Sequence, residues 1–128
     1  MAYCRRIAHP HVQFSGYLPQ RQLVLHYARS KVHALPSWFE TTGLSSLEAG
    51  AMGCNLVVGR GGDTGEYFTN HASFCDADNP EDLQNALCRE LHRENSFDFR
   101  EHILAHYTWE KAAVKTRDAY LNIVERGT

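Results

Sequence analysis

The chain has 128 residues, with 13 Lys and Arg against 15 Asp and Glu, a formal net charge of −2, and 43% hydrophobic residues. This size and balance predict one globular domain and exclude an intrinsically disordered chain. The near-neutral charge gives no field that would attract nucleic acid, and no apolar run approaches the roughly 20 residues of a membrane span. The start of the chain lacks the apolar region of a secretory signal. We therefore expect no nucleic-acid partner, no transmembrane segment and a cytoplasmic location.

Short apolar runs alternate with amphipathic stretches, which is the pattern of parallel strands joined by helices. In chain order we expect a strand at 12–15, a helix at 20–28, a strand at 32–35, a helix at 45–52, and strands at 55–58 and 73–75. A helix is expected to begin at Pro80, and Thr108 is expected to cap a long C-terminal helix. The sequence thus predicts an α/β layer protein.

The cysteines and histidines give little sign of a metal or disulfide framework. No Cys-x-x-Cys pair occurs, so reduced packing residues are expected at Cys4, Cys54, Cys75 and Cys88. His102 and His106 are four residues apart and could face one metal on a helix, but no Glu follows His102 to make the metalloprotease pattern. We expect no metal site.

The junction after the 32–35 strand is the most informative segment. The strand leads into a loop that carries Glu40, then into Gly43, which permits close backbone approach, and then into a helix. The free N–H groups and positive dipole end of that helix suit a phosphate. Glu48 follows about 6 Å beyond Leu44 along the helix axis. The two carboxylates would flank the phosphate and accept hydrogen bonds from ligand hydroxyls, an arrangement suited to a diphosphate with a sugar at either end.

Other interpretations of these residues stay open. Ser45 and Glu48 have the spacing of a capping box, in which Glu48 would bond the Ser45 N–H and have no ligand role. The glycine-rich segment 59–65 follows a strand and could bind phosphate, although its glycines fit neither Gly-x-Gly-x-x-Gly nor a P-loop. Paired carboxylates also cleave glycosides, but nothing here supplies a second site to activate water.

Glu40 and Glu48, with seven residues between them, resemble the Glu-x7-Glu motif of the family 4 retaining glycosyltransferases, also called group 1 glycosyltransferases. Further segments resemble that family in the same order, at 14–18, 48–58, 61–66, 78–87 and 107–110. Their order and spacing are specific, and the resemblance covers essentially residues 11–125. It implies a Rossmann-like, three-layer α/β/α fold that is part of the C-terminal domain of a GT-B enzyme.

The resemblance also implies roles for single residues. Glu40 would be the catalytic-site carboxylate that reaches hydroxyls of the transferred sugar, and Glu48 would bind the ribose of the nucleotide. Backbone groups would hold the rest of the donor, with the sugar and diphosphate at Gly43, Leu44 and Ser45 and the nucleobase at Gly16, Tyr17 and Leu18. Such enzymes take a nucleoside-diphosphate sugar as substrate, retain the anomeric configuration and use no metal or other cofactor.

The departures from the family limit what this chain is expected to do. The acceptor domain is absent, as are the first donor-domain strands with the Arg and Lys that usually neutralise the diphosphate; Arg60 is one candidate substitute. In the strand order 3-2-1-4-5-6 the absent strands would lie between 12–15 and 32–35 and leave a gap.

We therefore expect residues 1–128 to form a single nucleotide-sugar-binding domain that lacks its first strands. It would need an acceptor domain or companion subunit to transfer a hexosyl unit, would be inactive alone, and could be peripheral to a membrane through that absent domain. The alternative is a non-catalytic binding or assembly module that keeps the glycosyltransferase fold.

Overall fold

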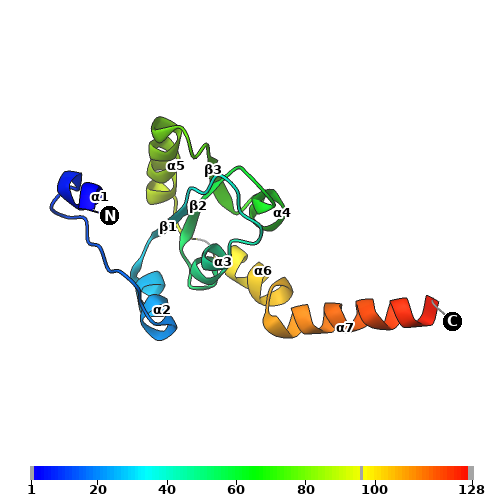
Figure 1. Ribbon diagram of the computed structural model, residues 1–128. Coiled ribbons are helices and arrows are strands. Elements are labelled where there is room, and N and C mark those ends of the chain that lie inside the picture. The colour runs from blue at the N-terminus through cyan, green and yellow to red at the C-terminus, as the bar shows by residue number, and fades with distance from the viewer. Residues whose placement is uncertain (1, 96, 127–128) are drawn as a thin grey trace.

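The computed structural model describes residues 2–95 and 97–126. Among these residues a small parallel sheet is surrounded by helices (Figure 1). In chain order the elements are α1 (Ala2–Ile7), α2 (Gln20–Arg29), β1 (Val32–Leu35), α3 (Leu44–Ala51), β2 (Asn55–Gly59), α4 (Thr64–Phe68), β3 (Ala72–Cys75), α5 (Pro80–His92), α6 (Asp98–His106) and α7 (Trp109–Arg126).

The sheet has the order β1-β2-β3, and both pairs of neighbouring strands are parallel. Val57 of the central strand pairs with Ala34 on one side and with Ser73 on the other. Every residue of β2 is buried, as expected for a parallel strand covered by helices on both faces. β2 is therefore the centre of the structure.

Two apolar clusters lie on opposite faces of β2. Leu56 and Val58 pack with Leu47, Phe68 and Phe99 from α3, α4 and α6, on one face. Val57, on the alternate face, packs with Ala86 of α5 and with half-buried Leu83 and Leu87. The expected three-layer α/β/α arrangement is therefore confirmed (Figure 1).

Buried polar contacts fix α5 on the sheet. Glu90 is only 2% exposed, and its carboxylate accepts a 2.7 Å hydrogen bond from Ser73 Oγ of β3 and lies 3.1 Å from Arg93 Nε. Asn55 of β2 donates to the Glu90 carbonyl at 2.8 Å. Because a buried charge is costly unless it is paired and hydrogen-bonded, these contacts hold α5 in one position on the sheet.

The expected strand at 12–15 is wrong. These residues form no strand, and the segment runs outside the sheet between α1 and α2 (Figure 1). A strand needs a neighbour to satisfy its backbone groups, and β1, the closest strand in the chain, ends the sheet at its edge. The helices α1 and α4 were not expected from the sequence, because each is too short for a helical period of apolar residues to show.

The C-terminal helix α7 projects away from the sheet (Figure 1). Thr108 caps it as expected, since Thr108 Oγ1 accepts a 3.3 Å hydrogen bond from the Lys111 N–H. None of its 18 residues, all of them described, is buried, and Trp109 and Tyr120 are 80% and 67% exposed. None of the helices in the described part of the chain has the length and apolar character needed to span a bilayer.

Close packing of α3 on α6 generates a prediction for Gly50. A Cβ at this position would lie 2.5 Å from Phe99 Cε1 and 2.9 Å from Ile103 Cδ1. We expect Gly50→Ala to lower the free energy of unfolding by about 1–3 kcal/mol, since overpacking forces neighbouring side chains to move. Gly65→Ala is the matched control, because a Cβ there meets only Thr69 Oγ1 at 4.0 Å. Urea unfolding should show the control unchanged or slightly stabilised, and an equal loss in both variants would contradict the packing argument.

Because two histidines are partly buried, we predict that the free energy of unfolding falls in mild acid. Burial lowers the pKa of His33 below its ordinary 6.5, and burial, then the nearby charges of His102 and Arg93, lower the pKa of His71. The unfolded chain therefore binds protons more readily, so stability is retained above pH 6.5 and is lost as the pH falls below it. Urea unfolding between pH 7.5 and 5.5 should show this loss. His33→Phe should reduce the pH dependence, whereas substitution of the exposed His26 by Gln should leave it as it is.

Candidate functional site

The loop that carries Glu40 is held by backbone contacts to the loop after β2. The Glu40 N–H donates to the Gly61 carbonyl at 3.3 Å, and the Glu40 carbonyl accepts from the Asp63 N–H at 2.9 Å. Glu40 and Gly62 form an isolated parallel bridge. The position of Glu40 is therefore set by main-chain hydrogen bonds that extend the pairing of β1 with β2 beyond the strands.

Only glycine fits on the facing side of this contact. A Cβ at Gly59 would lie 1.9 Å from the Ser37 carbonyl oxygen, and one at Gly61 would lie 1.9 Å from the Trp38 carbonyl oxygen. At Gly62, whose φ is +81°, a Cβ would lie 2.1 Å from the Glu40 oxygen. The glycine-rich segment that the sequence offered as a phosphate loop therefore has a packing role, which is to let the Glu40 loop approach.

The amino end of α3 lies beside Glu40. Gly43 precedes the helix in the left-handed conformation, with φ 62° and ψ 53°, and an added Cβ would lie 3.5 Å from Glu40 Cγ and 3.3 Å from the Phe68 ring. Among the described residues no side chain caps this helix, so the first amides, those of Leu44 and Ser45, remain available. The positive end of the helix dipole is therefore exposed next to a carboxylate. This helix end can bind an anion.

The capping box interpretation of Ser45 and Glu48 is wrong. The helix begins at Leu44, so Ser45 is already inside it and Gly43 occupies the cap position. Glu48 accepts a 2.9 Å hydrogen bond to Oε1 from Gln20 Nε2 rather than from the Ser45 backbone. The helix begins at Leu44, one residue before the predicted start at Ser45, because Gly43 adopts the left-handed conformation that leads the chain into the helix.

Gln20 joins Glu48 to the loop expected to contact a nucleobase. It is the first residue of α2 and directly follows Pro19, so Gly16, Tyr17 and Leu18 end two residues before the contact with Glu48. Gly16 has φ +67° and Tyr17 is 93% exposed. Sequence analysis missed Gln20 because the pairing joins residues 28 apart with no motif between them.

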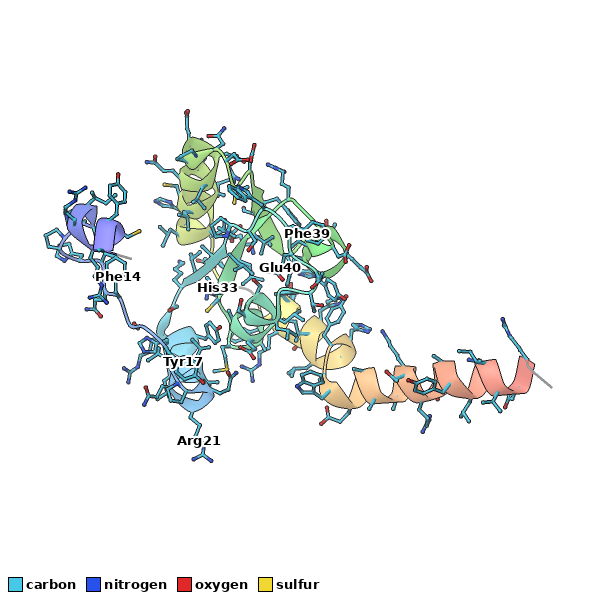
Figure 2. All side chains as sticks on the ribbon, in the orientation of Figure 1. Phe14, Tyr17, Arg21, His33, Phe39 and Glu40 are labelled. Atoms are coloured by element: carbon cyan, nitrogen blue, oxygen red, sulfur yellow. The ribbon has the colours of Figure 1, made fainter. Side chains whose placement is uncertain are left out.

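Two of the predicted carboxylates therefore lie along α3, at its amino end and at its middle. Its amino end lies beside Glu40 and its fifth residue, Glu48, contacts the start of α2. Figure 2 shows Glu40 on the loop after β1 and Tyr17 near α2, on a different part of the molecule. The charge of Glu48 also reaches Tyr27 of α2, since burial first and then this carboxylate raise the pKa of the Tyr27 hydroxyl.

Arg60, the candidate substitute for a phosphate-binding cation, makes its contacts elsewhere. Its guanidinium lies 3.5 Å from Asp82 Oδ2 and donates to the Phe74 carbonyl at 3.2 Å. A backbone hydrogen bond from Asp76, followed by the charge of Arg60, lowers the pKa of Asp82. The positive charge of Arg60 is thus matched by Asp82 of α5 and by the Phe74 carbonyl of β3.

Three histidines lie close together at α6. His102 and His106 are close on α6, with ring centroids 4.7 Å apart, and His71 stacks on His102 at 5.2 Å. Within residues 2–95 and 97–126, no group of three or more potential ligands is arranged to hold a metal ion. Cys54 and Cys75 are buried as expected for packing residues, whereas the other two cysteines are exposed, and all four are free thiols.

Comparison with known proteins adds a family and a fold. Residues 6–103 match the family model described as Glycosyl transferases group 1. No curated protein matches the sequence. Among solved structures the chain is similar to a sucrose-phosphate synthase from Thermosynechococcus elongatus, with 23% sequence identity and a TM-score of 0.76. The match covers 90% of this chain and 31% of that protein, so the chain spans less than a third of its length, and the likeness shows the GT-B fold.

The close approach at Gly62 can be tested separately from its positive φ. Gly62→Ala adds both backbone strain and a clash with Glu40, whereas Gly53→Ala, at φ +91°, adds strain with nothing within 4 Å. We expect the control to lower the free energy of unfolding by about 1–2 kcal/mol and Gly62→Ala to lower it by a further 1–3 kcal/mol. Amide NMR shifts of residues 37–45 should change in Gly62→Ala alone, and equal changes in both variants would contradict the packing role.

Proposed function

We propose that this chain, which belongs to the group 1 glycosyl transferases, binds the nucleoside-diphosphate sugar donor of such an enzyme. The observation that carries the proposal is the uncapped amino end of α3, with Glu40 beside it and Glu48 one turn further along. One anion-binding helix end between two carboxylates matches a ligand with a charged centre and hydroxyls on both sides.

The diphosphate would lie at the amino end of α3. The amides of Leu44 and Ser45 and the helix dipole supply hydrogen bonds and partial positive charge without a metal ion. These donors would also stabilise the negative charge that develops on the diphosphate as the sugar leaves. We propose no metal or other cofactor for the site.

Glu48 would accept hydrogen bonds from the ribose hydroxyls. An ionised carboxylate has about four acceptor positions, so Glu48 keeps acceptor capacity after receiving the Gln20 hydrogen bond. Because Gln20 also fixes the start of α2, the loop of Gly16, Tyr17 and Leu18 would place its backbone against the base. Gln20 would thus act as a positioning residue for Glu48.

Glu40 would contact the hydroxyls of the transferred sugar. Its loop is fixed by the backbone of Gly61 and Gly62, so the carboxylate needs little reorganisation when the donor binds. We infer transfer of a hexosyl unit with retention of configuration, with Glu40 orienting the sugar while the α3 amides stabilise the leaving group. Glu40 and the α3 amides would thus be the donor-side contribution of this chain to the chemical step.

Turnover would need an acceptor domain or companion subunit. β1 ends the sheet at one edge, where two further strands are expected in the complete donor domain, and α7 presents exposed apolar residues that include Leu121 and Val124. We propose that a companion part covers these surfaces and supplies the acceptor site. The isolated chain would then bind donor without transferring sugar.

A non-catalytic assembly module remains the second candidate. The exposed apolar residues of α7 favour it, because a face of this kind is typical of a helix that binds a partner. This candidate predicts partner binding without affinity for nucleotide sugars, so a donor-binding measurement separates the two functions.

Substitution of the two glutamates tests the donor site. Calorimetric titration with UDP, GDP and ADP and with their hexose conjugates should identify one nucleotide series that binds. Glu48→Gln should weaken both the free nucleoside diphosphate and its conjugate by roughly tenfold, about 1.4 kcal/mol, since it removes charged hydrogen bonds to ribose. Glu40→Gln should weaken only the sugar-bearing donor.

Glu66→Gln serves as the control, because Glu66 is exposed on α4. It should bind every ligand as the unsubstituted chain does. Equal effects of Glu40→Gln and Glu48→Gln on the free nucleoside diphosphate would contradict the assigned roles. A folded chain that binds none of the nucleotides would favour the assembly module.

A further inference from the structure

The charged residues of this chain are segregated along its sequence. Residues 1–39 contain five Lys and Arg and no Asp or Glu, and the first carboxylate of the chain belongs to Glu40. Residues 40–128 contain eight Lys and Arg against 15 Asp and Glu. The net charge of −2 thus consists of +5 in the first segment and −7 in the second. The first segment, unlike the chain as a whole, has a field that attracts an anionic surface.

The five cations of this segment lie on α1, on α2 and shortly after α2, and all of them are exposed. They are Arg5, Arg6, Arg21, Arg29 and Lys31. Among the described residues none of the five forms an ion pair, whereas Arg60, Arg93 and Arg117 each lie within 3.5 Å of a carboxylate oxygen. The positive charge of α1 and α2 is therefore available to another molecule.

The positive and negative segments lie on different sides of the molecule. In Figure 1, α1 and α2 lie on the β1 side of the sheet and α4 lies on the β3 side. Residues 61–82, which run from the loop before α4 to the start of α5, contain six Asp and Glu and no Lys or Arg. An anionic surface would attract α1 and α2 and repel residues 61–82, so it would bind the molecule in one orientation.

Apolar side chains lie between the cations. Arg21, Leu25 and Arg29 are four residues apart on α2 and share its exposed side, opposite the side that packs into the core. Leu25 is 57% exposed, and Figure 2 shows Arg21 extending away from the sheet. On α1, Ile7 is 62% exposed next to two arginines. Basic residues with exposed aliphatic side chains among them are typical of helices that lie at a membrane surface.

The aromatic rings of the segment favour a bilayer over a nucleic acid. A nucleobase stacks on an open ring. The guanidinium of Arg6, however, lies over the Tyr3 ring, 5.4 Å from its centroid. Arg5 lies over the Phe14 ring in the same way at 5.2 Å, which also holds α1 beside the segment that follows it. The exposed aliphatic side chains offer no ring to a base, but they can enter the apolar region below lipid headgroups.

We propose that α1 and the exposed side of α2 bind the surface of an anionic lipid bilayer. The arginines would contact the headgroup phosphates, and Ile7 and Leu25 would lie just below them. Long arginine side chains suit this arrangement, because their stems lie along apolar surface while the charged ends stay in the polar layer. The helices would lie on the membrane rather than cross it. This binding does not depend on the proposed donor site.

Flotation with vesicles tests the proposed surface. We expect the chain to float with phosphatidylcholine vesicles that contain about one third phosphatidylglycerol, and not with phosphatidylcholine alone. Salt at about 1 M should release most of the chain, since charges are then screened beyond about 3 Å. Arg21→Gln combined with Arg29→Gln should weaken binding by roughly tenfold or more, because two surface cations are lost. Leu25→Asn should weaken it several-fold.

The matched control removes two exposed positive charges elsewhere, by Arg100→Gln on α6 combined with Lys115→Gln on α7. Both double variants have the same net charge, so only the position of the charges differs. The control should bind vesicles as the unsubstituted chain does, and circular dichroism should show every variant folded. An equal loss in both double variants, or no loss in Leu25→Asn, would overturn the proposal.

Two further measurements separate the partners and the sites. A chain that does not float with the anionic vesicles would overturn the proposal, and so would polyuridylate RNA that binds more tightly and displaces the chain from them. The double variant of Arg21 and Arg29 should bind nucleoside diphosphate as the unsubstituted chain does. A chain that binds vesicles and no nucleotide would support the membrane surface and reject the donor site.

Discussion

The site depends on the close packing of two backbone segments, 37–40 and 59–62. Three glycines permit it, because a Cβ at Gly59, Gly61 or Gly62 would lie within about 2 Å of a carbonyl oxygen on the facing segment. This contact prolongs the parallel pairing of β1 and β2 beyond the strands and fixes Glu40 at the amino end of α3. One packing constraint thereby sets the position of Glu40.

The buried residues that stabilise the domain are concentrated around β2. Its five residues are buried from both faces, and α3, α4, α5 and α6 cover it. Neither α1 nor α7 contributes a buried residue to the described part of the chain. Substitutions on the two terminal helices should therefore have little effect on folding, whereas changes at the sheet and at the α3–α6 contact affect the whole domain. This division leaves α7 available for contacts outside the domain.

Elements with a periodic apolar pattern and clear end signals could be predicted from the sequence. Pro80 at the first helical position and Thr108 at a cap located α5 and α7 correctly, and the apolar run of β2 identified the buried strand. The strand at 12–15 failed because strand formation depends on a neighbour that the local sequence does not encode. Likewise, the Ser-x-x-Glu spacing could not show that Gly43 takes the cap position of the helix. Nor could it show that Gln20, far away in sequence, donates a hydrogen bond to Glu48. Periodicity predicted the fold, whereas pairings between distant segments required the structure.

The charge balance at the proposed donor site explains why binding and turnover would separate. A diphosphate carries more negative charge than the roughly half unit of positive charge that one helix end supplies. Arg60 cannot make up the difference where it lies, because its guanidinium is paired with Asp82 and turned toward β3. Glu40 and Glu48 add further negative charge beside the helix end. Under the proposed function, the α3 amides would orient the diphosphate and stabilise part of its charge as a leaving group, while the further cations that it needs would come from the companion part. Under that proposal, this chain would position the donor and the companion part would complete the reaction.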